Sequence, residues 1–343
     1  RGCGLPIRPW QDYCAASRSN PVLITYYGRR ILHFLELIPG SSTMGEVNGI
    51  EDDYTKVTIA TIISVSILIV IYLLLSDVWE KVAENSESFS NSSIIPLLYR
   101  MICCGFCVYA IIYMFRSGPA NMHVVRLEGN EDVLLHPIGI QKFVTFSSWT
   151  LLTCTGFFLL SSINQLRFMF DVSAISWLMS LQTVLFCMGI SMAFLTATVV
   201  RYVILPDMIS NNNSHSHMFL YHEQIMHNFA GIFLGLDLIL VKPKLVPEFA
   251  IFGLLIGIAY ISFAYVLAYF GPGFFVYSFL HPQPKIAPWF ATGLAVCIAL
   301  FYLGLWLITQ LGDSLWWLQL VILVTWLSLI VQFRIEENSP TAS

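Results

Sequence analysis

Long apolar runs alternate with polar links along most of the chain. A helix needs about 20 consecutive apolar residues to cross the hydrocarbon core of a bilayer. Polar links that carry Pro or Gly separate the runs, as in "RSGPANMHVVRLEGNEDVLLHP". The pattern therefore predicts an all-α, polytopic transmembrane helix bundle of about eight spans: Val57–Ser76, Ile94–Phe115, Phe143–Ile163, Leu178–Leu205, Ile225–Val241, Phe249–Phe270, Trp289–Leu311 and Leu315–Phe333.

Lys and Arg residues are distributed unequally between the two sides of this predicted bundle. Twelve lie in the segments on the side of the N-terminus, four lie in the opposite loops, and Arg100 lies inside a span. Because cytoplasmic loops carry the excess of basic residues, both termini are predicted to be cytoplasmic. The sequon at Asn91 then falls on the far side, where it is open to glycosylation, and the sequon at Asn212 falls on the cytoplasmic side.

The composition agrees with lipid as the main solvent of the chain. Hydrophobic residues make up 57% of the 343 residues and charged residues only 11%, against about 25% charged residues in soluble domains. The net charge is −4 and the basic residues form no stripe, so nucleic acid is not an expected partner. Cys3 and Cys14 are the one cysteine pair in a polar segment, and they suit a disulfide if that segment lies in an oxidising compartment.

Ionisable groups at membrane depth are candidates for function, because burying them in lipid is costly. His227 and Asp237 fall in the fifth predicted span. Ten residues separate them, or about 15 Å along a helix axis, so Asp237 cannot orient His227. The structural alternative for Asp237 is a carboxylate that hydrogen-bonds hydroxyl groups of neighbouring helices.

Two residues are predicted to meet at the cytoplasmic side of the membrane. The third span begins at Phe143 and the fifth at Ile225, both from that side, which places Thr145 and His227 in first helical turns at similar depth. A hydroxyl beside a neutral imidazole forms a minimal nucleophile–base pair, and unpaired first-turn amides could receive an oxyanion. The alternative is structural, since Thr is an ordinary helix N-cap and His227 would then only mark the membrane boundary.

The histidines near "HSHMFLYHEQIMH" suggest a metal site, but their spacing argues against one. His222 and His227 are five residues apart, which turns them about 140° from each other on a helix, whereas a zinc helix needs H-E-x-x-H. No metal and no cofactor are therefore expected.

Small residues follow His227 along the same helix face. Gly231 and Gly235 come at four-residue steps, and Gly253 and Gly257 repeat the spacing in the next span. Such pairs usually allow close helix packing. A smooth strip beneath His227 would equally accommodate an acyl chain, and the sequence leaves both interpretations open.

Three segments together resemble a known family. "QKFVTFSSWTLL", "MHNFAGIFLGLDL" and "YISFAYVLAYFGPGFFVYSFL" occur in that order and are similar to the androgen-induced protein family of multi-pass membrane threonine hydrolases, which includes the androgen-dependent regulator of tissue factor pathway inhibitor. Rolling-stone-like proteins also look similar. The likeness covers about residues 100 to 311.

The resemblance implies hydrolysis of fatty acid esters of hydroxy fatty acids. The family's nucleophile falls on Thr145, its histidine on His227, its acidic position on Asp237 and its tyrosine on Tyr277. The family's proline after that tyrosine is Ser278 here, which leaves the identity of the substrate open.

We therefore expect an intramembrane lipid esterase in which Thr145 is the nucleophile and His227 the base. Tyr277, Asp237, Gly231 and Gly235 are the predicted supporting or substrate residues. The alternative is a non-enzymatic integral membrane subunit or scaffold of a larger complex. Membrane lipids and a lipid ester are the expected ligands, and an endomembrane, first the endoplasmic reticulum, is the expected location.

The chain is expected to divide into four parts around one membrane core. Residues 1–56 form a cytoplasmic tail, 57–93 an extra first transmembrane helix with its loop, 94–311 a six-helix hydrolase-like core, and 312–343 an extra last helix with a short tail. The tail and the two extra helices are the predicted contact surfaces for membrane-protein partners.

Overall fold

The computed structural model describes residues 53–90, 93–129, 131–210 and 215–334. The predicted Cys3–Cys14 pair, most of the N-terminal tail and the Asn residues of both sequons lie outside these ranges. Within them the chain is mostly helical, which confirms the predicted fold class.

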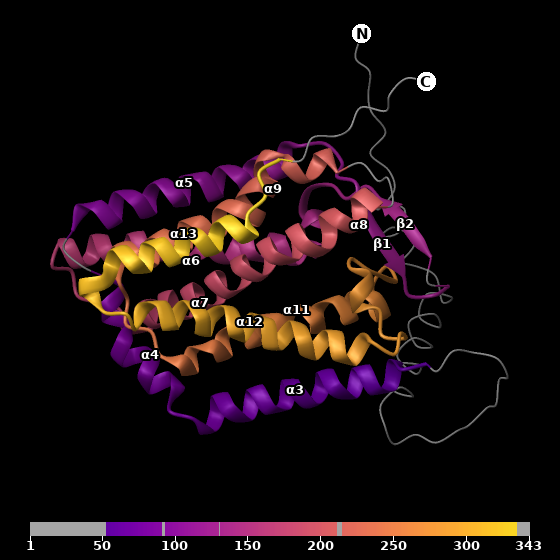
Figure 1. Ribbon diagram of the computed structural model, residues 1–343, viewed down its shortest axis with the longest axis horizontal. Helices are drawn as coiled ribbons and strands as arrows, with labels where there is room; N and C mark the ends of the chain where they lie inside the picture. The colour runs from indigo at the N-terminus through magenta and orange to yellow at the C-terminus, as the bar shows by residue number, and fades with distance from the viewer. Residues whose placement is uncertain (1–52, 91–92, 130, 211–214, 335–343) are drawn as a thin grey trace, which may run out of the picture.

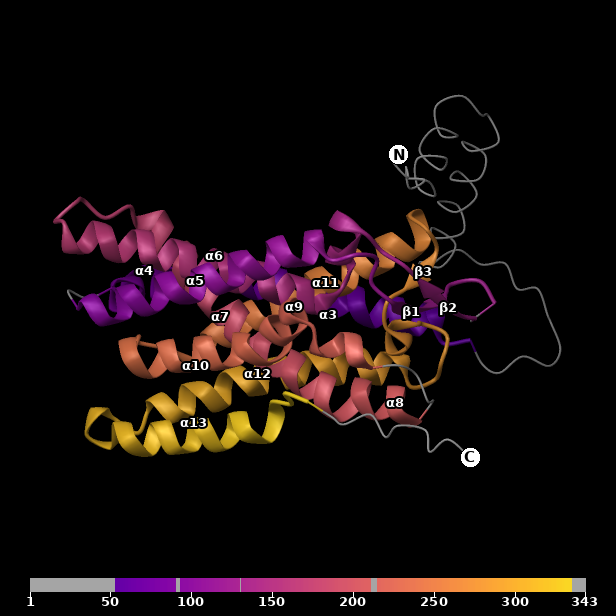
Figure 2. The same ribbon diagram turned by 90° about the horizontal axis from the view of Figure 1, so that it is seen from above.

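Seven helical stretches of the described chain are long and apolar enough to cross a membrane. An eighth apolar helix, Trp316–Ile330, has 15 residues and is shorter than the predicted span Leu315–Phe333. The long helices pack side by side, roughly parallel to one axis of the molecule (Figures 1 and 2). The seven long stretches are α3 (Thr55–Leu75), α5 (Ile94–Arg116), α6 (Phe146–Met169), α7 (Ser176–Val199) with α8 (Leu205–Ser210), α9 (Tyr221–Gln224) with α10 (Ala230–Val241), α11 (Ala250–Phe270) and α12 (Ala287–Thr309). The shorter helix Trp316–Ile330 is α13.

Two of these stretches contain a π-helical turn between their two α-helical parts. Val200–Ile204 joins α7 to α8, and Ile225–Phe229 joins α9 to α10. A π-turn inserts an extra residue into an α-helix and occurs frequently at functional sites. The second π-turn contains His227, so the local geometry of that residue differs from the plain first turn expected from the sequence.

The two ends of the bundle differ in structure. One end, called here the sheet end, carries a three-stranded antiparallel sheet in the order β2–β1–β3, formed by β2 (Asp132–Leu135), β1 (Met122–Arg126) and β3 (Phe274–Phe275). The opposite end carries the amphipathic helix α4 (Val78–Ser86). Both features lie in links that the hydropathy pattern treats as loops. The sheet end is on the right in Figures 1 and 2 and is the side that the distribution of Lys and Arg predicts to be cytoplasmic.

The α7–α8 helix forms the centre of the bundle. In its most apolar window 78% of the residues are buried, against 22% in α3 and α12. Its neighbours include α6, α10, α11 and α12. The outward faces of the peripheral helices carry exposed Ile, Leu, Val, Phe and Trp side chains, as expected where the neighbour is lipid.

Candidate functional site

Thr145 is the N-cap of α6, one residue before the helix begins. Its Oγ1 accepts a hydrogen bond from the backbone N–H of Ser148 at 3.2 Å and lies 2.7 Å from Oγ of Ser148. Oγ of Ser148 in turn donates to the carbonyl of Lys142 at 2.8 Å, which leaves the Thr145 hydroxyl as the donor in the Thr145–Ser148 pair. The Thr145 hydroxyl therefore has the capping geometry that the sequence offered as its structural alternative.

His227 lies more than one turn inside its helix, and the prediction of a first-turn position is wrong. The polar residues Tyr221–Gln224 form an additional helical turn before it, because a Glu near a helix N-terminus is favourable. His227 is 4% exposed, and its Nε2 atom lies 3.4 Å from Oε2 of Glu223. The other ring nitrogen, Nδ1, is buried and has no hydrogen-bond partner. One nitrogen thus contacts a carboxylate, and the other has no hydrogen-bond partner among the described residues.

Thr145 and His227 line the same cavity at the sheet end. This cavity, called here the vestibule, has a volume of about 900 Å³. Its walls also include Ser147, Ser148 and Glu223. Among the described residues, no direct hydrogen bond joins Thr145 and His227, although both line this cavity.

The side chain of Tyr277, from the link after α11, contacts the N-terminus of α6 next to Thr145. Its hydroxyl oxygen accepts the backbone N–H of Phe146 at 3.2 Å. Burial raises the pKa of Tyr277 to about 12, although the backbone N–H of Phe146 offsets part of this effect. The phenol therefore stays neutral, and its proton can be donated into the vestibule, whose wall includes Tyr277.

Lys142 fixes the segment before α6 to the end of α5. Its ammonium group donates to the carbonyls of Met114, Ser117 and Gly118 and to Oγ of Ser117, at 2.8 to 3.0 Å. These carbonyls belong to the C-terminus of α5, where a cation is favoured. Burial lowers the pKa of Lys142. Because the carbonyl of Lys142 also accepts from Ser148, this ammonium group helps to hold Thr145 in place.

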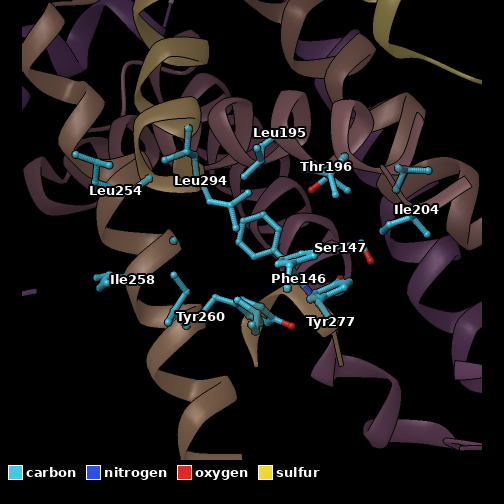
Figure 3. Close-up of a pocket in the computed structure, with 18 of the residues that line it drawn as sticks. Phe146, Ser147, Leu195, Thr196, Ile204, Leu254, Ile258, Tyr260, Tyr277 and Leu294 are labelled. Atoms are coloured by element: carbon cyan, nitrogen blue, oxygen red, sulfur yellow. The ribbon is translucent and has the colours of Figure 1, made fainter. Parts of the chain in front are cut away.

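A second, smaller cavity adjoins the vestibule inside the bundle. It has a volume of about 80 Å³ and is called here the slot (Figure 3). The two cavities share five lining residues, which mark their junction: Ser147, Ile204, His227, Tyr277 and Phe279. The remaining lining of the slot is almost entirely apolar and comes from α3, α6, α7, α11 and α12 with their adjoining turns.

Asp237 lies in a different part of the bundle and pairs with Arg100 of α5. The guanidinium group binds both carboxylate oxygens, at 2.7 and 3.0 Å, and both side chains are fully buried. The same group donates at 2.8 Å to Oε1 of Gln165 and to the carbonyl of Phe89. The structural alternative for Asp237 expected hydroxyl groups of neighbouring helices as partners. This expectation is wrong, because the partner is the guanidinium group of Arg100. Among the described residues, no hydrogen bond or ion pair joins Asp237 to His227. The carboxylate instead links two helices, α10 and α5, through its ion pair with Arg100.

Gly231 and Gly235 face α13. A Cβ atom at Gly231 would lie 3.5 Å from Leu327, and one at Gly235 would lie 3.2 Å from Leu323. Asn228 extends this contact, because its side chain forms two hydrogen bonds with the backbone of Gln332. Of the two interpretations of the glycine face, the described contacts agree with close helix packing.

Glu223 is the residue that the sequence interpretation missed. Asp237 was the carboxylate considered beside His227, whereas the carboxylate that contacts His227 belongs to Glu223, four residues earlier on the same helix face. The i, i+4 spacing of Glu223 and His227 is the signal that could have found it. Among the described residues, no group of three or more His, Cys, Asp or Glu side chains could hold a metal ion.

Comparison with known proteins gives no match. No family model, no curated protein and no solved structure matches the chain. The similarity to the androgen-induced family therefore stays a prediction based on the three motifs. The class that the sequence and the fold establish is a multi-pass, helical integral membrane protein.

Proposed function

We propose that the protein is an intramembrane esterase that hydrolyses acyl esters of lipids at the sheet end of the bundle. The observation that carries this proposal is the convergence of Thr145 and His227, 82 residues apart, on one cavity that adjoins an apolar slot. A hydroxyl can serve as the nucleophile in acyl transfer, an imidazole next to a carboxylate as the base, and a neutral phenol as the oxyanion donor.

In the proposed reaction, Oγ1 of Thr145 attacks the ester carbonyl and its proton passes to His227. Because no direct hydrogen bond joins the two side chains in the described structure, the proton travels through a water molecule or a substrate oxygen in the vestibule. The Tyr277 hydroxyl donates to the oxyanion. Collapse of the tetrahedral intermediate expels the alcohol, which takes the proton from His227. Water then attacks the acyl–threonine, with His227 again as the base, and releases the fatty acid.

The test separates the chemical role of Thr145 from its role as a helix cap. Asn caps helices as well as Thr does but offers no hydroxyl nucleophile. Thr145→Asn should therefore keep the fold and lose both hydrolysis of 4-nitrophenyl palmitate in nanodiscs and labelling by a fluorophosphonate probe. Thr145→Ser keeps the cap and the hydroxyl and should retain labelling.

A second variant tests the base. His227→Gln keeps an amide near Glu223 but removes the imidazole, and it should reduce turnover by about 10² or more. Full activity in Thr145→Asn or His227→Gln would exclude this mechanism. Absence of labelling in the wild type, together with co-purification of other membrane proteins in fixed stoichiometry, would favour the alternative of a membrane subunit.

A further inference from the structure

We infer that the slot binds a single unsubstituted acyl chain, and that α3 forms part of its wall and helps to set its specificity. The orientation of the bound acyl chain rests on the proposed function, which places the carboxyl end of the acyl chain at the junction of Ser147, His227 and Tyr277. The existence of an acyl-chain site is independent of whether an ester is cleaved there.

The chemistry of the lining restricts the occupant. Most polar side chains of the slot already have partners inside the protein. Thr196 contacts Oγ1 of Thr150 at 3.2 Å, the Tyr260 hydroxyl donates to the carbonyl of Val144 at 3.0 Å, and Ser147 donates to Thr145 at 3.2 Å. The unpartnered polar atom of the lining is Nδ1 of His227, at the junction with the vestibule. An occupant can therefore be polar at the junction and must be apolar along the rest of the slot.

The slot extends far enough to receive a chain. On α12, Ile298 lies eleven residues past Ala287, or about 16 Å along the axis from the sheet end. On α11, Leu254 lies sixteen residues before Phe270, or about 24 Å. The hydrocarbon core is about 30 Å thick, so the slot reaches from the sheet end to the middle of the membrane or beyond. Figure 3 shows Leu254 and Leu294 on one side of the slot, with Ser147 and Tyr277 on the other.

One glycine keeps the slot open between α11 and α12. A Cβ atom at Gly257 would have ordinary contact with Ile298 at 3.7 Å, and Gly257 lines the slot. Gly253, one turn earlier, is a packing residue instead, because its Cβ would lie 3.0 Å from Ser191. A larger side chain at position 257 would project into space that an acyl chain needs.

Helix α3 takes part directly in this site. Val65 and Ile69 of α3 line the slot, and α3 packs against α11 and α12. On the sequence interpretation, α3 lies outside the hydrolase-like core at residues 94–311. The contacts of Val65 and Ile69 give this additional helix a role in ligand binding.

The test uses the full chain in nanodiscs and a palmitic acid that carries a diazirine and an alkyne. Photolabelling of the wild type should yield adducts on slot residues of α3, α11 or α12, and excess palmitate should compete while hexanoate should not. Gly257→Leu should reduce these adducts at least tenfold. Gly293→Leu is the matched control on α12, because a Cβ there meets nothing within 4 Å, and it should label as the wild type does.

A second variant, on the neighbouring helix, keeps the inference testable if the first variant does not fold. If Gly257→Leu does not fold, Ala295→Leu narrows the same slot from α12 and should reduce the adducts similarly. Adducts confined to lipid-facing residues, or unchanged slot labelling in a folded Gly257→Leu or Ala295→Leu protein, would overturn the inference. Competed slot labelling in a wild type that hydrolyses no ester would establish the acyl site and refute the esterase.

Discussion

Oε2 of Glu223 lies 3.4 Å from Nε2 of His227, one helical turn further along the chain. Oε1 of the same carboxylate lies 3.3 Å from Nε2 of His222. Glu223 therefore connects two imidazoles in the wall of the vestibule and holds the His227 ring with its Nδ1 edge unpaired. A carboxylate in this position fixes both the orientation and the tautomer of an imidazole base.

The first prediction concerns the carboxylate of Glu223 as a positioning group. Glu223→Gln should lower kcat by at least about tenfold, because the amide no longer favours the tautomer that the reaction uses. The acid limb of the rate–pH profile should also move, and Glu223→Asp should recover part of the rate. A purely structural role would lower the rate equally at every pH and leave the profile in place.

The second prediction concerns the phenol of Tyr277. Tyr277→Phe removes the proposed oxyanion donor, so kcat should fall by about 10² with little change in KM. Tyr302→Phe is the control, because its hydroxyl donates to the carbonyl of Val246 and its ring is buried away from both cavities. An equal loss of activity in both variants would indicate a general packing effect and contradict the role of Tyr277.

The third prediction concerns the ion pair between Arg100 and Asp237. Removing one partner leaves an uncompensated buried charge, so Asp237→Leu or Arg100→Met should each lower the free energy of unfolding by about 3–5 kcal/mol. The double variant should recover much of that loss, which thermal unfolding in detergent can measure. The more exposed pair Lys81–Glu248 supplies the comparison, since Lys81→Ala should lower the free energy of unfolding far less than either change in the buried pair. A double variant that is no better than the single ones would show that the pair does not act as a unit.

The membrane architecture was largely predictable because hydropathy is a property of consecutive residues. Seven of the eight apolar runs correspond to helices long enough to span, and the eighth is shortened to α13. The sheet between residues 122 and 275 was not predictable in this way. Its strands are short, and β3 pairs with β1 across about 150 residues, so the register depends on how the helices place their ends.

The sequence pointed to a shared location for Thr145 and His227, but not to Glu223 or to the contacts among these residues. The rule that two helices entering from one side place their first turns together led to Thr145 and His227, which line one cavity. The cap formed by Thr145 with Ser148, and the use of an α6 amide by Tyr277, depend on loop conformation that no periodicity reveals. The Arg100–Asp237 pair was missed because charge pairing between distant helices leaves no local signal.

The fourth prediction concerns His281, which lies in the link between α11 and α12 and is 2% exposed. Burial lowers the pKa of His281 below its ordinary value. The folded state therefore prefers the neutral imidazole, whereas the unfolded chain takes up a proton near pH 6.5. The contribution of His281 to stability is complete above about pH 6.5 and declines as the pH falls below that value.

The matched variant for this residue is His281→Gln. The difference in unfolding temperature between the wild type and His281→Gln should shift in favour of the variant as the pH falls from about 7.5 to about 5. All other titrating groups are shared and cancel in the comparison. A constant difference over that range would show that His281 does not titrate differently in the folded and unfolded states.

The fifth prediction concerns the packing of α13 against the helix that carries His227. Gly235→Leu places a side chain where a Cβ alone would lie 3.2 Å from Leu323, so it should lower the free energy of unfolding by about 1–3 kcal/mol. Gly105→Leu on α5 is the control, because nothing lies within 4 Å of its Cβ position. Since Asn228, next to His227, binds the backbone of Gln332 just after α13, displacement of α13 should also disturb His227. Gly235→Leu should therefore lower turnover while Gly105→Leu leaves it unchanged, and full activity in a destabilised Gly235→Leu protein would show that α13 supports the fold without positioning the imidazole.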